Sequence, residues 1–332
     1  MTTHLVTGAA GFIGSHLCET LLQQGFDVVG LDNMNHYYDP DIKQNNLLSV
    51  EKVAHAAGRE FSFYMGDIRH QDKVAQILRQ DKIDTIFHLA AMAGVRPSLQ
   101  NPRLYVDVNE LGTINLLEEA KNAGVQKFIF ASSSSVYGNQ LKTPFAESDN
   151  VDHPISVYAA TKKSGELLCH NYHKIYGLSI ACLRFFTVYG PRQRPDLAIR
   201  KFADAIKKNK PVTVYGDGSK SRDYTFIDDI VTGICQAQNW LTNNQTPCYD
   251  VFNLGESKTI SVLDMIQALE VILGKKAVLD FQSDVLGDVE KTFADISKAK
   301  AVLGYNPTTN FNTGLQKFVE WYLKFNSQAR AA

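Results

Sequence analysis

Tyr158 and Lys162 have the residue types and the spacing of a proton-transfer pair. They lie in SVYAATKKSGE, and the i, i+4 spacing places both side chains on one face of a helix. A lysine ammonium beside a phenol stabilises the phenolate and lowers the phenol pKa from about 10 toward neutrality. We therefore expect Tyr158 to serve as a general acid or base near neutral pH. Alone, such a pair is more typical of a solvated helix face.

A run of four serines precedes this pair. The stretch KFIFASSSSVYG, residues 127–138, places the serines at the end of an apolar run with the pattern of a strand. A hydroxyl at that point can bridge the phenol and a substrate hydroxyl, which eases proton transfer. Together with the glycine loop below, the serines favour a catalytic interpretation of Tyr158 and Lys162.

A glycine-rich loop near the N-terminus has the spacing of a dinucleotide-binding turn. VTGAAGFIGSHL places Gly8, Gly11 and Gly14 between an expected strand and an expected helix. In such loops the first glycine permits a tight turn, the second lets a pyrophosphate approach the backbone, and the third lets helix and strand pack closely. The helix N-terminus then faces the phosphates. A lone match is a weak signal, but this one opens the chain and lies between a strand and a helix.

Two aspartates end the next two expected strands. A carboxylate at Asp32 accepts hydrogen bonds from the adenosine ribose diol and repels a 2′-phosphate, so we expect NAD rather than NADP. Asp67 is a weaker candidate for contact with the adenine edge. An equally good alternative for Asp67 is the N-cap of a helix over 68–80.

The elements that must position these residues alternate between β-rich and helical patterns. Strands are expected at 4–8, 27–32, 61–67, 85–91, 127–133 and 179–185. Helices are expected between them, at 14–25, 71–80, 112–124 and 159–177. This alternation predicts an α/β fold with a doubly wound parallel sheet of the Rossmann type. Strands that are apolar on both faces suit a sheet covered by helices on both sides.

After about residue 185 the pattern changes. Residues 187–198 are rich in Pro, Gly and Arg, 214–226 has the composition of a polar loop, and amphipathic stretches follow near 261–273 and 312–325. We predict two domains. The NAD-binding Rossmann domain spans 1–180 plus about 226–256, and a smaller mixed α/β substrate domain spans about 181–225 plus 257–332.

The composition limits the partners that the chain can bind. A net charge of −1 and a pI of about 6.8 give no basic field, so we expect neither nucleic acid nor a membrane as a partner. Five scattered cysteines without a C-x-x-C pair indicate buried thiols in a reducing compartment, and no metal site. The first residues lack a basic region before a long apolar one, and we expect a cytoplasmic protein.

Together these motifs resemble the extended short-chain dehydrogenase/reductases, in the group of nucleotide-sugar epimerases and dehydratases. The resemblance covers nearly the whole chain and rests on TGAAGFIG, DN at 32–33, GDI at 66–68, HLAA at 88–91, SSSSVYG, YAATK, RFFTVYGPRQRPD, VYGDGSKSRDYTFIDD and GDVEKTFADISKAKAVLGY. It implies a catalytic set of Ser133, Tyr158 and Lys162, with the serine placed by counting back from the tyrosine. It implies NAD as the cofactor, in contact with Gly8, Gly11, Phe12, Ile13, Gly14, Asp32, Asn33, Asp67, Ile68, Leu89, Ala90, Ala91, Tyr158 and Lys162.

The resemblance also implies a UDP-sugar substrate and the residues that hold it. These are Arg96, Ser134, Ser135, Thr187, Arg192, Arg194, Tyr215, Arg222 and Asp288. In this group Arg222 clamps the pyrophosphate and Asp288 lies near the uridine ribose. UDP-galactose epimerases carry an arginine three residues before that aspartate, whereas this chain has Val285. A second diphosphate contact is therefore missing or comes from elsewhere, for example from Arg194.

Two positions in the serine run separate the reactions of this group. Dehydratases carry an Asp-Glu pair just after the strand hydroxyl, and decarboxylases of UDP-glucuronate typically carry a Glu there. Ser134 and Ser135 at these positions cannot act as carboxylic acid or base, which favours an epimerase. The less favoured alternative is that Glu147 or Asp149 supplies a carboxylate from a loop.

The loop after the second strand indicates the sugar. DNMNHYYDPDIKQNNL, residues 32–47, resembles UDP-glucuronate 4-epimerases, because UDP-glucose 4-epimerases lack the paired tyrosines. The guanidinium groups of Arg96, Arg192 and Arg194 can pair with a sugar carboxylate or with pyrophosphate. Any single one of them is equally a surface arginine, but we expect at least one to contact the uronate.

The resemblance thus implies an isomerase that epimerises a UDP-sugar at C4, most like UDP-glucuronate to UDP-galacturonate. It implies a transient 4-keto intermediate, with hydride transfer to and from bound NAD. The alternatives are a UDP-glucose or UDP-N-acetylglucosamine 4-epimerase, a UDP-glucuronate decarboxylase or dehydratase, and a non-catalytic NAD-sensing protein. The last would not need serine, tyrosine and lysine together. The family commonly pairs two long helices in a homodimer, here 102–124 and 157–176.

Overall fold

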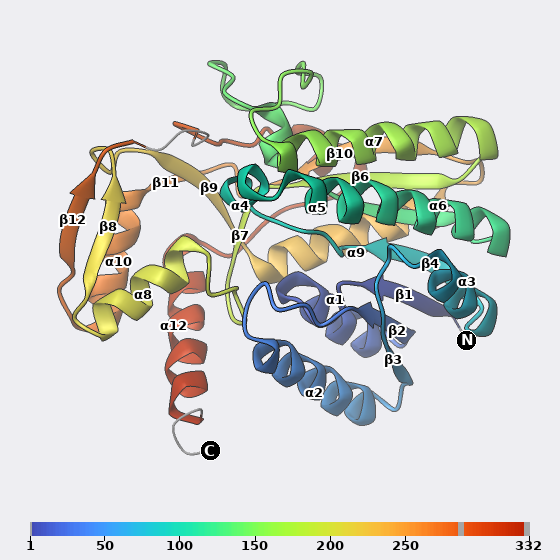
Figure 1. The fold of residues 1–332 in the computed structure, drawn as a ribbon, viewed down its shortest axis with the longest axis horizontal. Helices are drawn as coiled ribbons and strands as arrows, with labels where there is room; N and C mark the ends of the chain where they lie inside the picture. Colours follow the sequence, from blue (N-terminus) through green and yellow to red (C-terminus); the bar gives the residue numbers. More distant parts are fainter. Residues whose placement is uncertain (1, 285–288, 329–332) are drawn as a thin grey trace.

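A seven-stranded sheet forms the centre of the molecule (Figure 1). The computed structural model describes residues 2–284 and 289–328. The strand order is β10-β6-β5-β4-β1-β2-β3, and every neighbouring pair is parallel. The strands are β1 (Thr3–Thr7), β2 (Asp27–Asp32), β3 (Phe61–Met65), β4 (Ile83–His88), β5 (Lys127–Ser133), β6 (Ser179–Phe185) and β10 (Tyr249–Leu254). The order reverses between β1 and β4, where sheets of this class bind their ligands beyond the carboxyl ends of the strands. The α/β doubly wound prediction is confirmed.

Helices cover both faces of this sheet (Figure 1). On one face lie α1 (Phe12–Gln23), α2 (Pro40–Ala57) and α9 (Ile227–Asn243). On the other lie α3 (Gln71–Gln80), α5 (Pro102–Val106), α6 (Gly112–Ala123) and α7 (Val157–Tyr176). A π-helical turn, η1 (Asp107–Leu111), joins α5 to α6. A short helix α4 (Val95–Gln100) precedes α5.

The sheet divides the core into two clusters. Alternate side chains of one strand enter opposite clusters: Leu5 packs toward α3 and α6, and Val6 packs toward α1. All six residues of β2 are buried, which explains why its sequence is apolar without alternation.

The second part of the chain forms smaller sheets. β7 (Thr187–Tyr189), β9 (Ser221–Phe226) and β11 (Thr259–Ser261) make a three-stranded sheet, and β8 (Pro211–Tyr215) pairs with β12 (Val278–Gln282). Around them lie α8 (Ala198–Lys207), α10 (Val262–Leu273), α11 (Ser297–Leu303) and α12 (Phe311–Gln328). The expectation of a polar loop over 214–226 is wrong in part, because β8 ends and β9 lies in that range. The domain boundaries stay a prediction, although β10 does pair with β6.

Within the described residues, no helix is both long enough and apolar enough to cross a membrane.

Candidate active site

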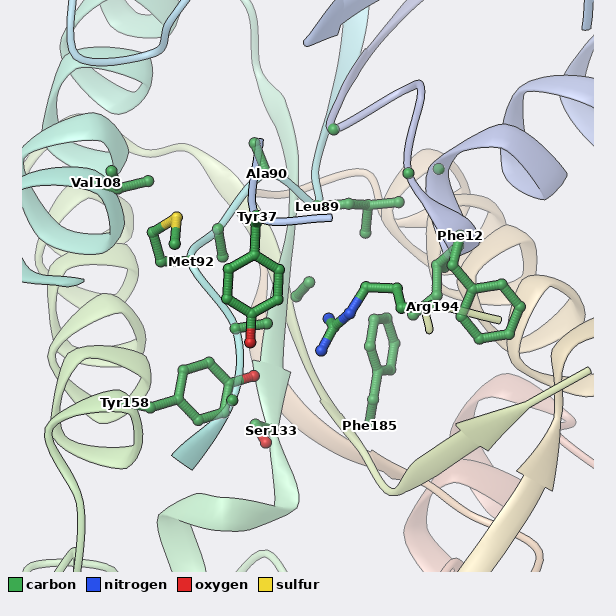
Figure 2. A pocket seen from close by; sticks show the side chains of 18 of the residues that line it. Phe12, Tyr37, Leu89, Ala90, Met92, Val108, Ser133, Tyr158, Phe185 and Arg194 are labelled. Atoms are coloured by element: carbon green, nitrogen blue, oxygen red, sulfur yellow. The ribbon is translucent and has the colours of Figure 1, made fainter. Parts of the chain in front are cut away.

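A cavity of about 440 Å³ opens beyond the carboxyl ends of the parallel strands. Its walls, shown in part in Figure 2, come from the segments after β1, β2, β3, β4, β5 and β6 and from α7. Every residue predicted to contact the cofactor lines it: Gly8, Gly11, Phe12, Ile13, Gly14, Asp32, Asn33, Asp67, Ile68, Leu89, Ala90, Ala91, Tyr158 and Lys162. The cavity therefore unites residues that lie far apart in the sequence.

The glycine loop has the tight geometry that its spacing predicts. Gly8 has a φ of +73° and donates its amide to the Leu31 carbonyl at 2.7 Å. A Cβ on Gly14 would lie 2.1 Å from the carbonyl oxygen of Gly8, so only glycine lets α1 start this close to β1. The N-terminus of α1, at Phe12, consequently faces the cavity.

Asp32 presents its carboxylate where the ribose of a dinucleotide would lie. Its oxygens accept the amides of Ala10 at 3.2 Å and Met34 at 2.9 Å. The Lys43 ammonium lies 3.4 Å from the same carboxylate and also lines the cavity. The glycine cradle, the Asp32 carboxylate in the cavity wall and the cavity itself together fit NAD. Lys43 has no signal in the sequence, because its place beside Asp32 depends on how α2 packs.

Asp67 is held by its neighbours. Arg69 donates to it through Nε at 3.0 Å and Nη2 at 2.8 Å, and Asn33 donates through Nδ2 at 2.9 Å. Burial raises the pKa of this carboxyl, but the hydrogen bonds hold the pKa well below its usual range. The alternative of a helix N-cap is wrong, because α3 begins at Gln71 and its N-cap residue is His70.

The predicted catalytic residues meet at the cavity wall. Tyr158 is the second residue of α7, and its phenol lies near the Ser133 hydroxyl at the end of β5 (Figure 2). Lys162 lies one helical turn further along α7, with its Nζ 5.9 Å from the Tyr158 ring centroid. That ammonium donates to the Ala131 carbonyl at 2.8 Å, and burial lowers the pKa of Lys162 to about 8. The structure thus brings all three residues together.

The expected effect of Lys162 on the tyrosine is not what the structure gives. Burial raises the pKa of Tyr158 above its ordinary value. The influences that oppose burial come from the hydrogen bond with Ser133 and the positive charge of Arg194. Lys162 is not among these influences, and its ammonium donates to the Ala131 carbonyl, so the structure does not show the lowering of the Tyr158 pKa toward neutrality that was expected from Lys162.

The four serines have distinct contacts. The Ser132 hydroxyl is buried and donates to Glu166 Oε1 at 2.6 Å. Ser133 Oγ accepts from the amide of Ser135 at 3.2 Å and from its hydroxyl at 3.0 Å. Ser134 and Ser135 begin the short helix η2 (Ser134–Tyr137) and line the cavity, as does Thr187.

Arg194 is the predicted arginine that lines the cavity. It donates to Asp196 through Nε at 2.9 Å and Nη2 at 2.8 Å. Its guanidinium carbon lies 5.6 Å from the Tyr37 ring centroid, and Figure 2 shows both side chains directed into the cavity with Tyr158. The bidentate pair leaves its remaining N–H groups available to a second anion.

Among the described residues, four further predicted substrate residues are not part of the cavity wall: Arg96, Arg192, Tyr215 and Arg222. Arg192 donates to Glu19 at 2.6 Å and so contacts α1. The guanidinium of Arg96 lies 4.6 Å from the Tyr215 ring centroid, and Arg222 donates to the Ser221 and Glu290 carbonyls. Asp288 and Val285 lie outside the described residues.

Two further residues at the site were missed as participants. Tyr37 lines the cavity, and hydrogen bonds with Tyr105 and Asp196 hold its phenol. In the sequence, the paired tyrosines indicate only the resemblance to UDP-glucuronate 4-epimerases. Asn109, in the π turn, accepts from the Met92 amide at 2.8 Å and donates to Thr161 at 3.0 Å. No sequence pattern predicts a π turn, so the role of Asn109 in joining the wall after β4 to α7 had no signal.

The fold and the site together define an NAD-binding protein of the short-chain dehydrogenase/reductase class. Residues 5–318 match the family model described as GDP-mannose 4,6 dehydratase. The chain is 44% identical to a UDP-glucuronate 4-epimerase of Thermodesulfobacterium geofontis, over 97% of this chain and 96% of that protein. It is also 44% identical to UDP-glucuronate 4-epimerase 1 of Arabidopsis thaliana, over 97% of this chain and 76% of that protein.

Solved structures of nucleotide-sugar 4-epimerases have the same fold as this chain. The UDP-glucuronic acid 4-epimerase of Bacillus cereus, in complex with UDP-glucuronic acid and NAD, superposes with a TM-score of 0.89 at 40% identity. The match covers 98% of this chain and 100% of that chain. A UDP-glucose 4-epimerase of Thermotoga maritima has a TM-score of 0.87 at 31% identity, over 98% and 100% of the two chains. The protein therefore belongs to the GDP-mannose 4,6-dehydratase family, and within it resembles the nucleotide-sugar epimerases.

Proposed function

We propose that this protein is an NAD-dependent 4-epimerase that converts UDP-glucuronate to UDP-galacturonate. The observation that carries the proposal is that one cavity unites the Ser133, Tyr158 and Lys162 set with Arg194 and with a serine wall that lacks carboxylates. The similarity to UDP-glucuronate 4-epimerases over nearly the full length supports it.

Tyr158 is placed to move the proton of the sugar 4-hydroxyl. As the phenolate it accepts this proton, and as the phenol it returns the proton after the sugar has turned its other face. Ser133 has both lone pairs engaged by Ser135, so its own hydrogen is free to stabilise the phenolate. NAD, held by the glycine loop and Asp32, supplies a reversible hydride acceptor when bound. The cavity walls orient the sugar C4 toward that acceptor.

The serine wall and Arg194 suit a uronate. A 4-keto uronate is a β-keto acid, which loses CO₂ when its carboxylate aligns for C–C cleavage. We propose that Ser134, Ser135, Thr187 and Arg194 hold the carboxylate away from that alignment. A decarboxylase or dehydratase is disfavoured, because the two serines offer no acid or base. Glu147, the loop carboxylate considered as a substitute, accepts the amide of Asn253 at 2.7 Å and is not among the cavity residues.

We propose further substrate contacts outside the cavity. Arg222 and Tyr215, with Arg96 stacked on the tyrosine, are proposed to contact the diphosphate or uridine from the second part of the chain. Tyr215 ends β8 and Arg222 lies in β9, in the part of the chain expected to form the substrate domain.

A UDP-glucose 4-epimerase is the second candidate. The observation in its favour is that Asp196 already forms an ion pair with Arg194. The pair reduces the positive charge that Arg194 offers to a sugar carboxylate, and a neutral sugar does not need this charge. The likeness to the Thermotoga maritima enzyme is consistent with this candidate.

One experiment separates these functions. The purified protein is incubated with UDP-glucuronate or with UDP-glucose, without added NAD, and the products are followed by proton NMR. Inversion at C4 of the uronate supports the proposal, and inversion of UDP-glucose alone supports the second candidate. Loss of CO₂ would identify a decarboxylase, and no conversion of either sugar would overturn both epimerase assignments.

We also propose a homodimer formed through α5–α6 and α7. Large apolar side chains are exposed on these segments: Val106, Leu111, Leu167 and Ile175. A second copy of the chain would cover this surface. Light scattering of the purified protein measures the mass, and Leu111→Glu with Leu167→Glu should convert a dimer to monomers. A monomeric wild-type protein would contradict the proposal.

A cytoplasmic location is likewise proposed. All five cysteines are free, as expected in a reducing compartment.

A further inference from the structure

A buried ion pair contacts Ser132, the residue that precedes the catalytic Ser133. Glu166 of α7 and Arg184 of β6 are 2% and 3% exposed, and two hydrogen bonds of 2.8 Å join them, from Nε to Oε1 and from Nη2 to Oε2. Neither residue lines the cavity. A buried ion pair contributes little net stability, because the cost of removing the charges from water offsets their attraction. Stability alone therefore gives no reason for this pair at this place.

The pair holds the start of the serine segment, which we define as residues 132–137. Glu166 Oε1 accepts the Ser132 hydroxyl at 2.6 Å, and Ser132 directly precedes the catalytic Ser133. Ser132 also stands opposite Arg184 in the register of β5 and β6. The strand end is thus fixed by a charge-assisted hydrogen bond, which is shorter and stronger than one between neutral groups.

The same pair holds the other end of the segment. Arg184 Nη1 donates to the Tyr137 hydroxyl at 2.9 Å, and this hydroxyl donates to Asn253 Oδ1 at 2.7 Å. Tyr137 ends η2, and Ser134 and Ser135 lie between the two anchored ends. Asn253 is fully buried in β10 and donates to the Phe145 and Asp295 carbonyls at 2.9 and 3.0 Å.

One face of α7 meets the whole strand end. Tyr158, Lys162 and Glu166 follow each other at intervals of four and so lie on one side of the helix. Lys162 holds the Ala131 carbonyl and Glu166 holds the Ser132 hydroxyl, so the next residue, Ser133, is set against Tyr158.

We propose that Glu166 and Arg184 are positioning residues for proton transfer. Through Ser132 the pair sets the contact between Ser133 and Tyr158, and through Tyr137 it sets the wall of Ser134 and Ser135 that faces the sugar. The inference deepens the proposed function and rests on it for the turnover assay.

The test uses variants that leave the ion pair itself intact. Ser132→Ala removes the link at one end, and Tyr137→Phe removes the hydroxyl at the other. Tyr172→Phe is the matched control. Tyr172 lies in α7, and its hydroxyl also donates to a glutamate, Glu118. All are compared with wild type by kcat, KM for UDP-glucuronate, the pH profile of kcat/KM and thermal unfolding.

The two ends should give different kinetic signatures. For Ser132→Ala we expect kcat to fall about tenfold with KM within about twofold, because a misplaced proton-transfer group slows the chemical step. The ascending limb of the pH profile should move to higher pH, since the hydrogen bond from Ser133 lowers the pKa of Tyr158. For Tyr137→Phe we expect mainly a rise in KM of about fivefold, with that limb unmoved, because the loosened residues bind the sugar.

Other outcomes overturn the inference. If kcat and the ascending limb of Ser132→Ala equal those of wild type, the pair does not position Ser133. If Tyr172→Phe loses as much activity as Ser132→Ala, the effect is general loosening of α7.

A third readout keeps the inference separate from the proposed function. Amide hydrogen exchange over residues 127–138 should speed up in Ser132→Ala and stay unchanged in Tyr172→Phe. If wild type converts no UDP-sugar, the proposed function fails, but this exchange still tests whether the pair holds the segment. Unchanged exchange in Ser132→Ala would overturn the positioning role in either case.

Discussion

The Tyr158 phenol experiences influences of opposite sign on its pKa. Burial favours the neutral phenol, whereas the hydrogen bond with Ser133 and the charge of Arg194 favour the phenolate. Burial prevails and the pKa is raised, so Ser133 and Arg194 are the groups that favour the phenolate, the form that must accept a proton in a reversible proton transfer.

Replacing Tyr158 with Phe should therefore remove turnover and spare binding. We expect kcat to fall by a factor of about 100 or more, because the acid and base of the step is lost. NMR of the product measures turnover, and calorimetric titration with the UDP-sugar measures binding. Tyr322→Phe, which removes a hydroxyl bonded to Asp204, is the control, because neither residue lines the cavity. Activity retained by Tyr158→Phe would reject the catalytic assignment.

Arg194 offers a prediction about sugar selectivity. Arg194→Lys keeps the charge but loses the planar fork, so we expect kcat/KM for UDP-glucuronate to fall about tenfold. UDP-glucose, which lacks the carboxylate, should lose less, and the ratio of the two values is the measurement. The exposed Arg103, paired only loosely with Asp107 at 3.9 Å, gives the control Arg103→Lys. Equal losses for both sugars would mean that Arg194 does not contact the uronate.

At the scale of elements, the start of α1 depends on the absence of a side chain. Gly14→Ala would place a Cβ against the Gly8 carbonyl, and backbone atoms cannot move aside without displacing the loop. We expect the purified variant to carry far less NAD than wild type, measured by releasing the nucleotide and recording its absorbance.

The control for this prediction is Gly58→Ala, at the end of α2. Nothing lies within 4 Å of a Cβ there, and only its φ of +61° resists the change. We expect a loss of about 1 kcal/mol in the free energy of unfolding and unchanged NAD content. Full NAD content in Gly14→Ala would contradict the close approach of α1 to β1.

Much of the element pattern was predictable from the sequence. The ranges of β2, β5, β6 and α3 agree with the predicted ones, because apolar runs and helical periodicity are local signals. Helices α2 and α9 were not predicted, and neither was β9, whose SRDYTF sequence is polar. Pairing with β7 and β11 makes β9 a strand, and such tertiary context overrides propensity.

The site was predictable to the extent that it lies in contiguous motifs. The glycine loop, Asp32, the serines and Tyr158 with Lys162 follow strands whose carboxyl ends meet at one edge of the sheet. That Arg194 rather than Arg192 lines the cavity was not predictable, because the backbone geometry of this loop has no signal in the sequence: Arg192 has a φ of +65°. The Glu166–Arg184 pair joins different elements and had no local signal.

At the scale of the whole molecule, His4 makes stability depend on pH. Its ring packs against Phe26 and Phe87 with centroids at 4.6 and 5.5 Å. Among the described residues neither ring nitrogen has a hydrogen-bond partner. Burial lowers the pKa of His4 to about 4, and Asp84 opposes this only partly. The unfolded chain binds this proton near pH 6.5, so the contribution is complete above pH 6.5 and is lost as pH falls toward 4.

His4→Leu should flatten this part of the acid response. Between pH 7 and pH 4.5 we expect the free energy of unfolding of wild type to fall about 2 kcal/mol further than that of the variant. Urea denaturation at several pH values measures this difference. The exposed His153 gives the control His153→Gln. Parallel pH curves for wild type and His4→Leu would contradict the prediction.

Strand β10 has a consequence for how the protein is made. It pairs with β6 at one edge of the sheet, yet roughly three quarters of the chain must leave the ribosome before it is available. Until then the nascent chain exposes the backbone donors and acceptors of β6, a hazard for aggregation. Asn253, which accepts a hydrogen bond from the Tyr137 hydroxyl, lies on β10 and is therefore also synthesised late. Translation of the chain therefore completes the sheet edge and the support of the catalytic wall in a single late event.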